Sequence, residues 1–326
     1  MTTGNNITIN GIRKMLYRHD NFLVFMHENP DADTIGSAFA LIYTLRSIGK
    51  KAYPVCCDKI PRSLMFLTDD ERFFGTEDLP EDFTPEFLIS VDVASPTQLG
   101  KYHFMAAKID LSLDHHPGHE EFAQYRFIDS KAGACAEIIY RVICRMLPDG
   151  IPEKTASLMY AALAADTGGF RYSNTTPFTH KIAAKLIEYG ANHAQICRNL
   201  FEMKTKTALS AEAFAMEHVE YLCGGKVSYV KITEKDKAEH GFEDEDTYDV
   251  INVIRRAEGV KVAILSREKQ PGIFKISTRS TGEIDMSKIC AMFGGGGHVG
   301  AAGCSVKADK ADEAVERIID ECGFDR

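Results

Sequence analysis

The sequence lacks an apolar run long enough to cross a membrane, and its N-terminus lacks the charged-then-apolar pattern of a secretory signal. We therefore expect no membrane association and a cytoplasmic location. A C-x-x-C pair is also missing, since the 9 cysteines are scattered along the chain. Such spacing is typical of reduced, mostly buried thiols, and it argues against a disulfide framework or a thiolate zinc site.

An excess of basic residues is missing as well, because 38 Lys and Arg stand against 47 Asp and Glu, for a formal net charge of -9. Proteins that bind long nucleic acid non-specifically usually have a basic surface. We therefore expect no long nucleic-acid partner and favour a small anionic substrate. The 326 residues, 44% of them hydrophobic, are enough for two domains and a large core.

Residues 1–195 alternate strand-like and helix-like patterns. Apolar runs predict strands at residues 22–26, 52–56, 87–91 and 107–113. Helical patterns cover residues 34–49, 62–67, 134–145, 153–165 and 177–189. This alternation predicts an α/β domain with a mainly parallel sheet and helices on both faces.

The rest of the chain predicts a smaller α/β domain at residues 219–326, across a cleft from the first and joined to it by a connecting helix within 196–218. Strands are expected at residues 226–232, 260–267 and 272–280. Helices are expected at residues 208–218, 248–257, 286–293 and 309–322.

Acidic and imidazole side chains stand at the ends of several apolar runs in the first domain. They are His27, Asp31, Asp33, Asp92, Asp114, His115, His116 and Asp166. Ligands of α/β proteins bind at the carboxyl ends of parallel strands, so we expect these side chains to converge there. Carboxylates and imidazoles suit a divalent cation such as Mn²⁺ or Mg²⁺. For residues 27–33, the alternative is a polar loop with an Asx-turn and a helix cap.

These motifs resemble the four signatures of the DHH phosphoesterase superfamily, in order: His27-x-x-x-Asp31-x-Asp33, Asp92, Asp114-His115-His116 and Asp166. The segment Phe293-Gly294-Gly295-Gly296-Gly297-His298-x-x-Ala301-Ala302-Gly303 looks like the glycine-rich signature of the DHHA1 domain. The resemblance covers nearly the whole chain and is strongest to the nanoRNase/pAp phosphatase group. One departure is Ala32, where the family often has glycine; alanine costs little unless the position needs a positive φ.

The resemblance implies a pair of Mn²⁺ ions, with Mg²⁺ or Co²⁺ as substitutes. The implied ligands are His27 and Asp31 for one ion, Asp33, His115 and Asp166 for the other, and Asp92 as a bridge that is also catalytic. His116 would contact the scissile phosphate and help to protonate the leaving group; the alternative is a supporting or surface histidine. Asp114 would orient an imidazole or the loop, or cap the loop as a buried structural residue.

The same resemblance implies substrate-binding residues in the second domain. They are Arg279, Gly295, Gly296, Gly297 and His298. The alternatives are an arginine solvated at a strand edge and a glycine run that is only a flexible turn. His119 matches no signature and is expected to be a surface or core residue, while residues 171–175 could edge the active site without an assigned contact.

The implied activity is hydrolysis of short oligoribonucleotides to mononucleotides, and of 3'-phosphoadenosine 5'-phosphate (pAp) to AMP and phosphate. Residues 1–195 would be the catalytic DHH domain and residues 219–326 the substrate-binding DHHA1 domain. A linear or cyclic dinucleotide phosphodiesterase is the nearest alternative. A pyrophosphatase, a nucleotide-binding module without catalysis and a DNA exonuclease with partners fit less well. A homodimer is compatible with the sequence.

Overall fold

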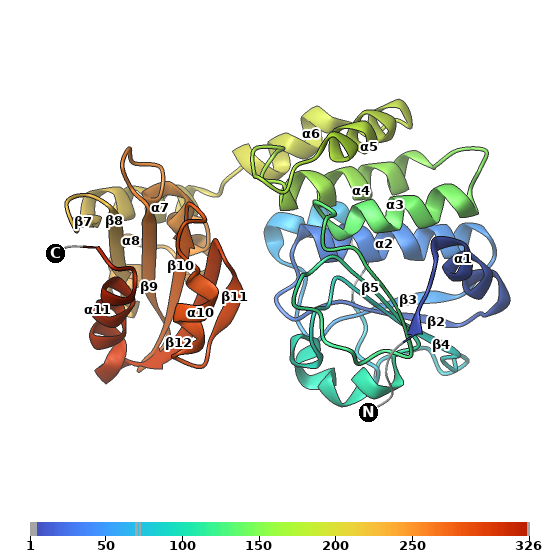
Figure 1. The fold of residues 1–326 in the computed structure, drawn as a ribbon, viewed down its shortest axis with the longest axis horizontal. Helices are drawn as coiled ribbons and strands as arrows, with labels where there is room; N and C mark the ends of the chain where they lie inside the picture. The colour runs from blue at the N-terminus through green and yellow to red at the C-terminus, as the bar shows by residue number, and fades with distance from the viewer. Residues whose placement is uncertain (1–4, 69–70, 72, 325–326) are drawn as a thin grey trace. The chain divides into compact units, whose positions relative to one another are not determined.

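The structure is a computed structural model that describes residues 5–68, 71 and 73–324, apart from the side chain of His298. It divides into two compact units, Met1–Met203 and Lys204–Arg326, each with a sheet and packed helices (Figure 1). The predicted α/β class and the division into a larger and a smaller domain are therefore confirmed. In the described ranges, every helix is too short or too polar to cross a membrane.

The first unit is built on a six-stranded, wholly parallel sheet in the order β1-β6-β5-β4-β2-β3. Its strands are β1 (Asn5–Asn6), β2 (Phe22–Phe25), β3 (Ala52–Val55), β4 (Phe87–Val91), β5 (Leu111–Asp114) and β6 (Tyr125–Ile128). Its helices are α1 (Ile9–Arg18), α2 (Ala32–Ser47), α3 (Cys135–Met146), α4 (Glu153–Asp166), α5 (Pro177–Glu188) and α6 (His193–Cys197). Shorter helical segments are η1 (Arg62–Leu67), η2 (Pro96–Lys108) and η3 (Arg198–Glu202).

The central strands are buried on both faces, which explains their continuous apolar runs. Along β2, Phe22 and Val24 join the core beneath α2 and α3, whereas Leu23 and Phe25 join the core covered by η2. In Figure 1, α4 lies over α2 and α3, and α5 and α6 form a further layer. The sheet and these helices therefore fix the positions of the strand ends.

Gly36 allows α2 and α4 to pack closely. A Cβ at this position would lie 2.5 Å from the carbonyl oxygen of Leu158 and 2.9 Å from Cβ of Ala162. Ala32 begins α2 without a positive φ, so its departure from the family's usual glycine introduces no backbone strain.

The second unit has a mixed six-stranded sheet in the order β11-β12-β10-β9-β8-β7, in which only the β8–β9 pair is parallel. Its strands are β7 (Glu220–Leu222), β8 (Val227–Ile232), β9 (Val262–Gln270), β10 (Ile273–Ser280), β11 (Gly296–His298) and β12 (Ala301–Lys307). Its helical segments are α7 (Lys206–His218), α8 (Glu234–His240), η4 (Asp244–Thr247), α9 (Val250–Ile254), α10 (Met286–Ala291), η5 (Ala308–Lys310) and α11 (Ala311–Glu321).

Several local predictions differ from the structure. The strand predicted at 107–113 begins only at Leu111, because the residues up to Lys108 complete η2 and pack against the sheet. Residues 196–218 form no single helix: the chain passes from α6 through η3 to α7. Strand β12 was not predicted, because its small residues match the glycine-rich signature. The domain limits 1–195 and 219–326 stay predictions.

Candidate active site

The predicted site residues of the first unit gather at one edge of the parallel sheet. Because β5, β4 and β2 are neighbours in the sheet, their carboxyl ends lie side by side. The side chains placed there follow β2 (His27), β4 (Asp92) and β5 (His115, His116), begin α2 (Asp31, Asp33) or end α4 (Asp166). The convergence expected from the sequence is therefore present.

One group of ligand atoms comes from His27, Asp31 and Asp92, with one such atom from each residue within 4.8 Å of the others. Nε2 of His27 lies 3.7 Å from Oδ1 of Asp31 and 3.7 Å from Oδ2 of Asp92. Asp31 also caps α2 by accepting hydrogen bonds from the backbone N–H groups of Asp33 and Thr34. The helix cap that we considered as an alternative is thus present beside the ligand group, and the two roles coexist.

A second group comes from Asp33, His115 and Asp166. Nε2 of His115 lies 3.8 Å from Oδ2 of Asp33 and 3.7 Å from Oδ2 of Asp166. Nδ1 of the same ring lies 3.2 Å from the carbonyl oxygen of Ala132, which orients Nε2 toward the carboxylates. This side of the cluster therefore presents imidazole and carboxylate atoms to a common centre.

Asp33 is held by the N-terminus of α3. The backbone N–H of Cys135 donates to Oδ2 over 2.6 Å and that of Ala136 to Oδ1 over 3.1 Å. The hydroxyl of Ser37 donates to Oδ1 as well. These hydrogen bonds satisfy N–H groups that the start of a helix leaves without partners, and they fix the Asp33 side chain in position.

Asp92 lies between the two groups. Its Oδ2 faces His27, while its Oδ1 lies 3.5 Å from Nε2 of His115 and 3.6 Å from Nδ1 of His116. The side chain is 3% exposed, and Oδ1 has no hydrogen-bond partner in the described part of the chain. A buried carboxylate oxygen without a donor is costly unless a positive charge compensates it. The donor set, carboxylate oxygens with imidazole nitrogens, fits divalent cations of the Mn²⁺ type.

The backbone of Asp92 is also unusual, with a φ of 60°. Aspartate tolerates this left-handed conformation better than most residues. The preceding residue, Val91, is fixed by a 3.1 Å hydrogen bond from the hydroxyl of Thr34 to its carbonyl oxygen. The strand end is thereby turned so that the carboxylate reaches both ligand groups.

The crowding of charges alters the proton affinities of the site. Burial alone would lower the pKa of His115, but three neighbouring carboxylates raise it to about 9. Burial raises the pKa of Asp166 to about 7; His115 opposes this shift, and the carboxylates of Asp31 and Asp92 add to it. For Asp33, burial and the charges of Asp92 and Asp166 likewise raise the pKa well above its ordinary value. A bound cation would replace the protons that this cluster otherwise retains.

His116 and Asp114 form a separate hydrogen-bonded pair. Nδ1 of His116 lies 2.7 Å from Oδ1 of Asp114, which also accepts the backbone N–H of His115. The other oxygen, Oδ2, lies 2.8 Å from Nδ1 of His119. His119, which the sequence pattern left without a role, is therefore a neighbour of the site, and no motif in the sequence indicated this contact.

Asn174 links two loops at the edge of the site. Its Nδ2 donates to the carbonyl oxygen of Gly133 over 2.8 Å and to that of Asp166 over 3.1 Å. The segment 171–175, for which the sequence assigned no contact, thus ties the loop before α3 to the end of α4.

The predicted substrate residues of the second unit share one end of its sheet. Arg279 in β10 is the register partner of Ala301 in β12, which in turn pairs with His298 in β11. A Cβ at Gly297 would lie 2.5 Å from the carbonyl oxygen of Ala301, and one at Gly295 would overlap the backbone of Gly303. These two glycines are therefore needed for close packing of β12, whereas Gly296 has open space around it. The side chain of His298 lies outside the described part of the structure.

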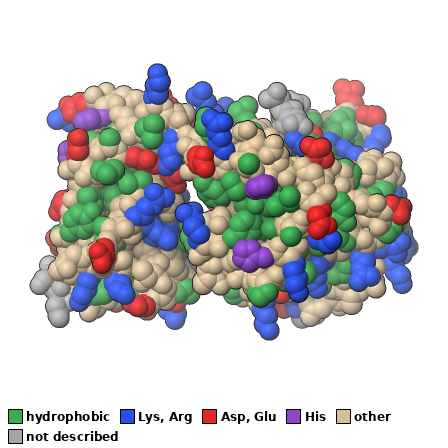
Figure 2. All heavy atoms as spheres, turned by 90° about the horizontal axis from the view of Figure 1, so that it is seen from above, with side chains coloured by type: hydrophobic (Ala, Val, Ile, Leu, Met, Phe, Trp, Pro, Cys, Tyr) green, Lys and Arg blue, Asp and Glu red, His purple; other side chains and the backbone are tan. Residues whose placement is uncertain are grey.

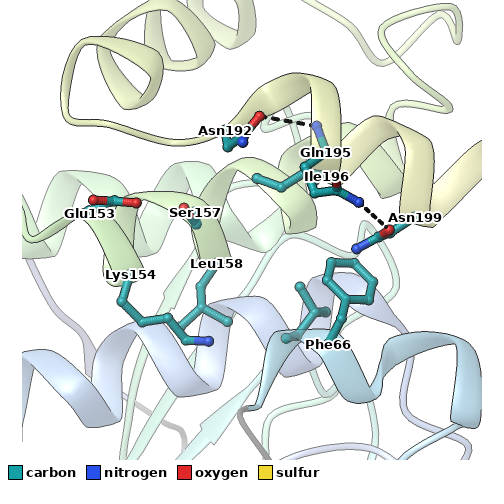
Figure 3. A pocket seen from close by; sticks show the side chains of 10 residues that line it. Phe66, Glu153, Lys154, Ser157, Leu158, Asn192, Gln195, Ile196 and Asn199 are labelled. Atoms are coloured by element: carbon teal, nitrogen blue, oxygen red, sulfur yellow. Dashed lines mark hydrogen bonds between the residues drawn. The ribbon is translucent and has the colours of Figure 1, made fainter.

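A pocket of about 420 Å³ lies elsewhere in the first unit, between the start of α4 and segments η1, α6 and η3 (Figure 3). Two hydrogen bonds lie at its rim: Nε2 of Gln195 donates to Oδ1 of Asn199, and the backbone N–H of Gln195 donates to Oδ1 of Asn192, which caps α6. The residues that line it include none of the predicted site residues. We therefore assign the chemistry to the cluster at the strand ends.

The fold and this cluster match a known class of protein. The model of the DHH family, N-terminal domain, matches residues 21–163, and the model of the DHHA1 domain matches residues 224–323. The chain belongs to the DHH family, in its two-domain DHH–DHHA1 form, and is a hydrolase of phosphoester bonds.

Individual relatives are similar over most of the chain. It is 30% identical over 298 residues to the bifunctional oligoribonuclease and PAP phosphatase NrnA of Thermus thermophilus, covering 90% of this chain and 86% of the relative. Its fold is similar to that of an exopolyphosphatase-related protein from Bacteroides fragilis, with a TM-score of 0.87, 21% identity and coverage of 96% and 95%. RecJ of Thermus thermophilus, crystallised in complex with Mn²⁺, has a TM-score of 0.59 and 13% identity; the match covers 97% of this chain and 55% of RecJ.

Proposed function

We propose that this protein hydrolyses short oligoribonucleotides to mononucleotides and pAp to AMP and phosphate. The relative from Thermus thermophilus is named for both activities. The observation that carries the proposal is the buried, partnerless Oδ1 of Asp92 between two ligand groups. Such an atom needs a cation, and cations at this position suit the hydrolysis of an anionic phosphoester.

The proposed cofactor is a pair of divalent ions, with Mn²⁺ favoured and Mg²⁺ or Co²⁺ as substitutes. Their ligands would be His27, Asp31, Asp33, Asp92, His115 and Asp166. Bound there, such a pair supplies an activated water and offsets the negative charge of the phosphoryl group.

His116 and Asp114 would act on the leaving group. Because Asp114 accepts a hydrogen bond from Nδ1 of His116, the proton to be transferred belongs to Nε2. The water oxygen forms a bond to phosphorus and releases one proton to solvent, while the bond from phosphorus to the leaving oxygen breaks. The leaving oxygen takes the proton from Nε2 of His116, and solvent then returns a proton to that nitrogen. The charge of Asp114 would stabilise the protonated imidazole until transfer.

Arg279 and the segment 295–298 would bind the end of the substrate. A guanidinium carries a fork of donors suited to a terminal phosphate, and the open backbone at Gly296 allows close approach of an anion. Nη1 of Arg279 donates to the carbonyl oxygen of Thr278, which holds the side chain near the strand.

The charge distribution favours a short substrate. In the view of Figure 2, Lys and Arg side chains are interspersed with acidic and hydrophobic ones on both units. With a formal net charge of -9, the protein offers little electrostatic attraction for a long polyanion. Binding would then depend on local cations at the site, which favours substrates with one or a few phosphates.

The test is a parallel assay of the Mn²⁺-loaded protein with pAp, a 5'-phosphorylated diribonucleotide, a long RNA, linear and cyclic di-AMP, and pyrophosphate. We expect rapid turnover of pAp and the diribonucleotide with the long RNA spared. A strong preference for a cyclic or linear signalling dinucleotide would retain the chemistry and reject the proposed substrates. No turnover of any phosphoester, in protein shown to contain Mn²⁺, would overturn the proposal.

A further inference from the structure

His119 is buried next to the proposed site although it belongs to none of the family motifs. Its side chain is 4% exposed and its ring packs against Phe122 at 5.3 Å between centroids. The chain turns after the two site histidines, and the backbone N–H of His119 donates to the carbonyl oxygen of His116 in this turn. The turn places the His119 imidazole against the carboxylate of Asp114.

Asp114 is completely buried, and each of its oxygens is occupied. Oδ1 accepts from the backbone of His115 and from Nδ1 of His116, and Oδ2 accepts from Nδ1 of His119 over 2.8 Å. With contacts on both oxygens, the carboxylate cannot rotate without breaking a hydrogen bond to His116 or to His119.

The bond from His119 has a cost that argues for a specific role. Its Nε2 is buried and has no hydrogen-bond partner in the described part of the chain. An apolar side chain of similar size would pack against Phe122 without leaving a buried nitrogen unsatisfied. The hydrogen bond to Asp114 is the one contribution of the imidazole that such a side chain could not replace.

We propose that His119 is a positioning residue for proton donation, holding Asp114 so that His116 presents Nε2 to the leaving oxygen. The relay His119–Asp114–His116 extends the Asp114–His116 pair by one member. This inference rests on the proposed function. A partner that orients a catalytic or metal-binding imidazole typically contributes about 10- to 100-fold to activity.

The test compares H119L with H119N. Leucine keeps apolar packing and loses the donor, whereas the asparagine amide can donate from nearly the position of Nδ1 and serves as the matched control. Each variant, loaded with Mn²⁺, is assayed on a diribonucleotide and on a p-nitrophenyl ester of a nucleoside 5'-phosphate. Nitrophenolate leaves without protonation, so its release does not need His116.

We expect H119L to lower kcat on the diribonucleotide about 10- to 100-fold with KM unchanged, and to lower kcat on the nitrophenyl ester only a few-fold. H119N should restore most of the diribonucleotide activity. Mn²⁺ affinity, measured by electron paramagnetic resonance, should match the wild type in both variants. If H119L does not fold, it is replaced by H119F, which keeps an aromatic ring at this position but has no N–H donor.

Equal losses on both esters would overturn the inference, as would a fully active H119L or a folded H119N as defective as H119L. Failure of the proposed function has a different signature, because the Mn²⁺-loaded wild type would then hydrolyse neither ester. The two failures are therefore distinguishable in the same experiment.

Discussion

At the scale of single residues, Asp92 connects the two ligand groups. Its carboxylate faces His27 with one oxygen and His115 with the other, and its backbone adopts a left-handed conformation that asparagine also tolerates. The substitution D92N therefore removes the negative charge with little change in shape or backbone preference.

We predict that D92N lowers hydrolysis about a hundredfold or more while the fold is retained. The physical reason is that a neutral amide cannot compensate two cations. Steady-state rates with Mn²⁺ measure the loss of hydrolysis, and thermal melts show whether the fold is retained. In melts of D92N, the increase in melting temperature that Mn²⁺ causes in the wild type should disappear. D82N is the matched control, since Asp82 is exposed in an ion pair with Lys51 near the opposite edge of the sheet. Near-wild-type turnover by D92N would contradict the bridging role.

At the scale of secondary-structure elements, the site depends on how α2, α3 and α4 meet. Asp33 begins α2 and is held by the start of α3, and Asp166 ends α4. The distance between these carboxylates therefore depends on the close packing of α2 and α4, which Gly36 permits.

We predict that G36A destabilises the protein by about 1–3 kcal/mol, because the new methyl group would meet the backbone oxygen of Leu158. It should also weaken Mn²⁺ binding, since α4 carries Asp166. Chemical denaturation and a Mn²⁺ titration measure the two effects. In the control G11A, the same change is made in α1, where the new methyl group meets the side chain of Ile7. An equal change in Mn²⁺ affinity in G36A and G11A would show that the α2–α4 packing does not set the metal affinity.

At the scale of the whole molecule, the metal-free protein retains protons that a cation would displace. The pKa of His115 is raised from 6.5 to about 9, so its stabilising charge is fully present below pH 6.5 and is lost as the pH rises through 9. The pKa of Asp166 is raised from 3.8 to about 7, so repulsion among the carboxylates grows as the pH rises through 7. Both changes lower the stability of the metal-free folded protein as the pH rises.

We therefore predict that the apparent melting temperature of the metal-free protein falls between pH 6 and pH 9. Mn²⁺ should counteract this fall, and its stabilising effect should be larger at the higher pH because fewer protons compete for the ligands. Scanning calorimetry in chelator and in excess Mn²⁺ measures both trends. A metal-free melting temperature that rises over this range would contradict the assignment of these groups as a crowded cation site.

The candidate ligands were predictable because each stands at the end of an apolar run, and the position of a strand end depends on local patterns. His119 was not predictable, because its contact with Asp114 depends on the turn that follows His116 and on burial that no local pattern reveals. For Asn174, the sequence predicted a position at the edge of the site within 171–175 but not its contacts, because the two acceptors, on Gly133 and Asp166, come from separate parts of the chain.

Short-range hydrophobic periodicity and family motifs were enough to predict the α/β class, the main strands and helices, and the residue types at the strand ends. These patterns could not predict the start of β5, the break of 196–218 into α6, η3 and α7, or the pairing of β12. In each case the local pattern was compatible with more than one conformation, and packing against distant residues selected one. The same holds for the site, where long-range contacts leave one oxygen of Asp92 unsatisfied and saturate both oxygens of Asp114.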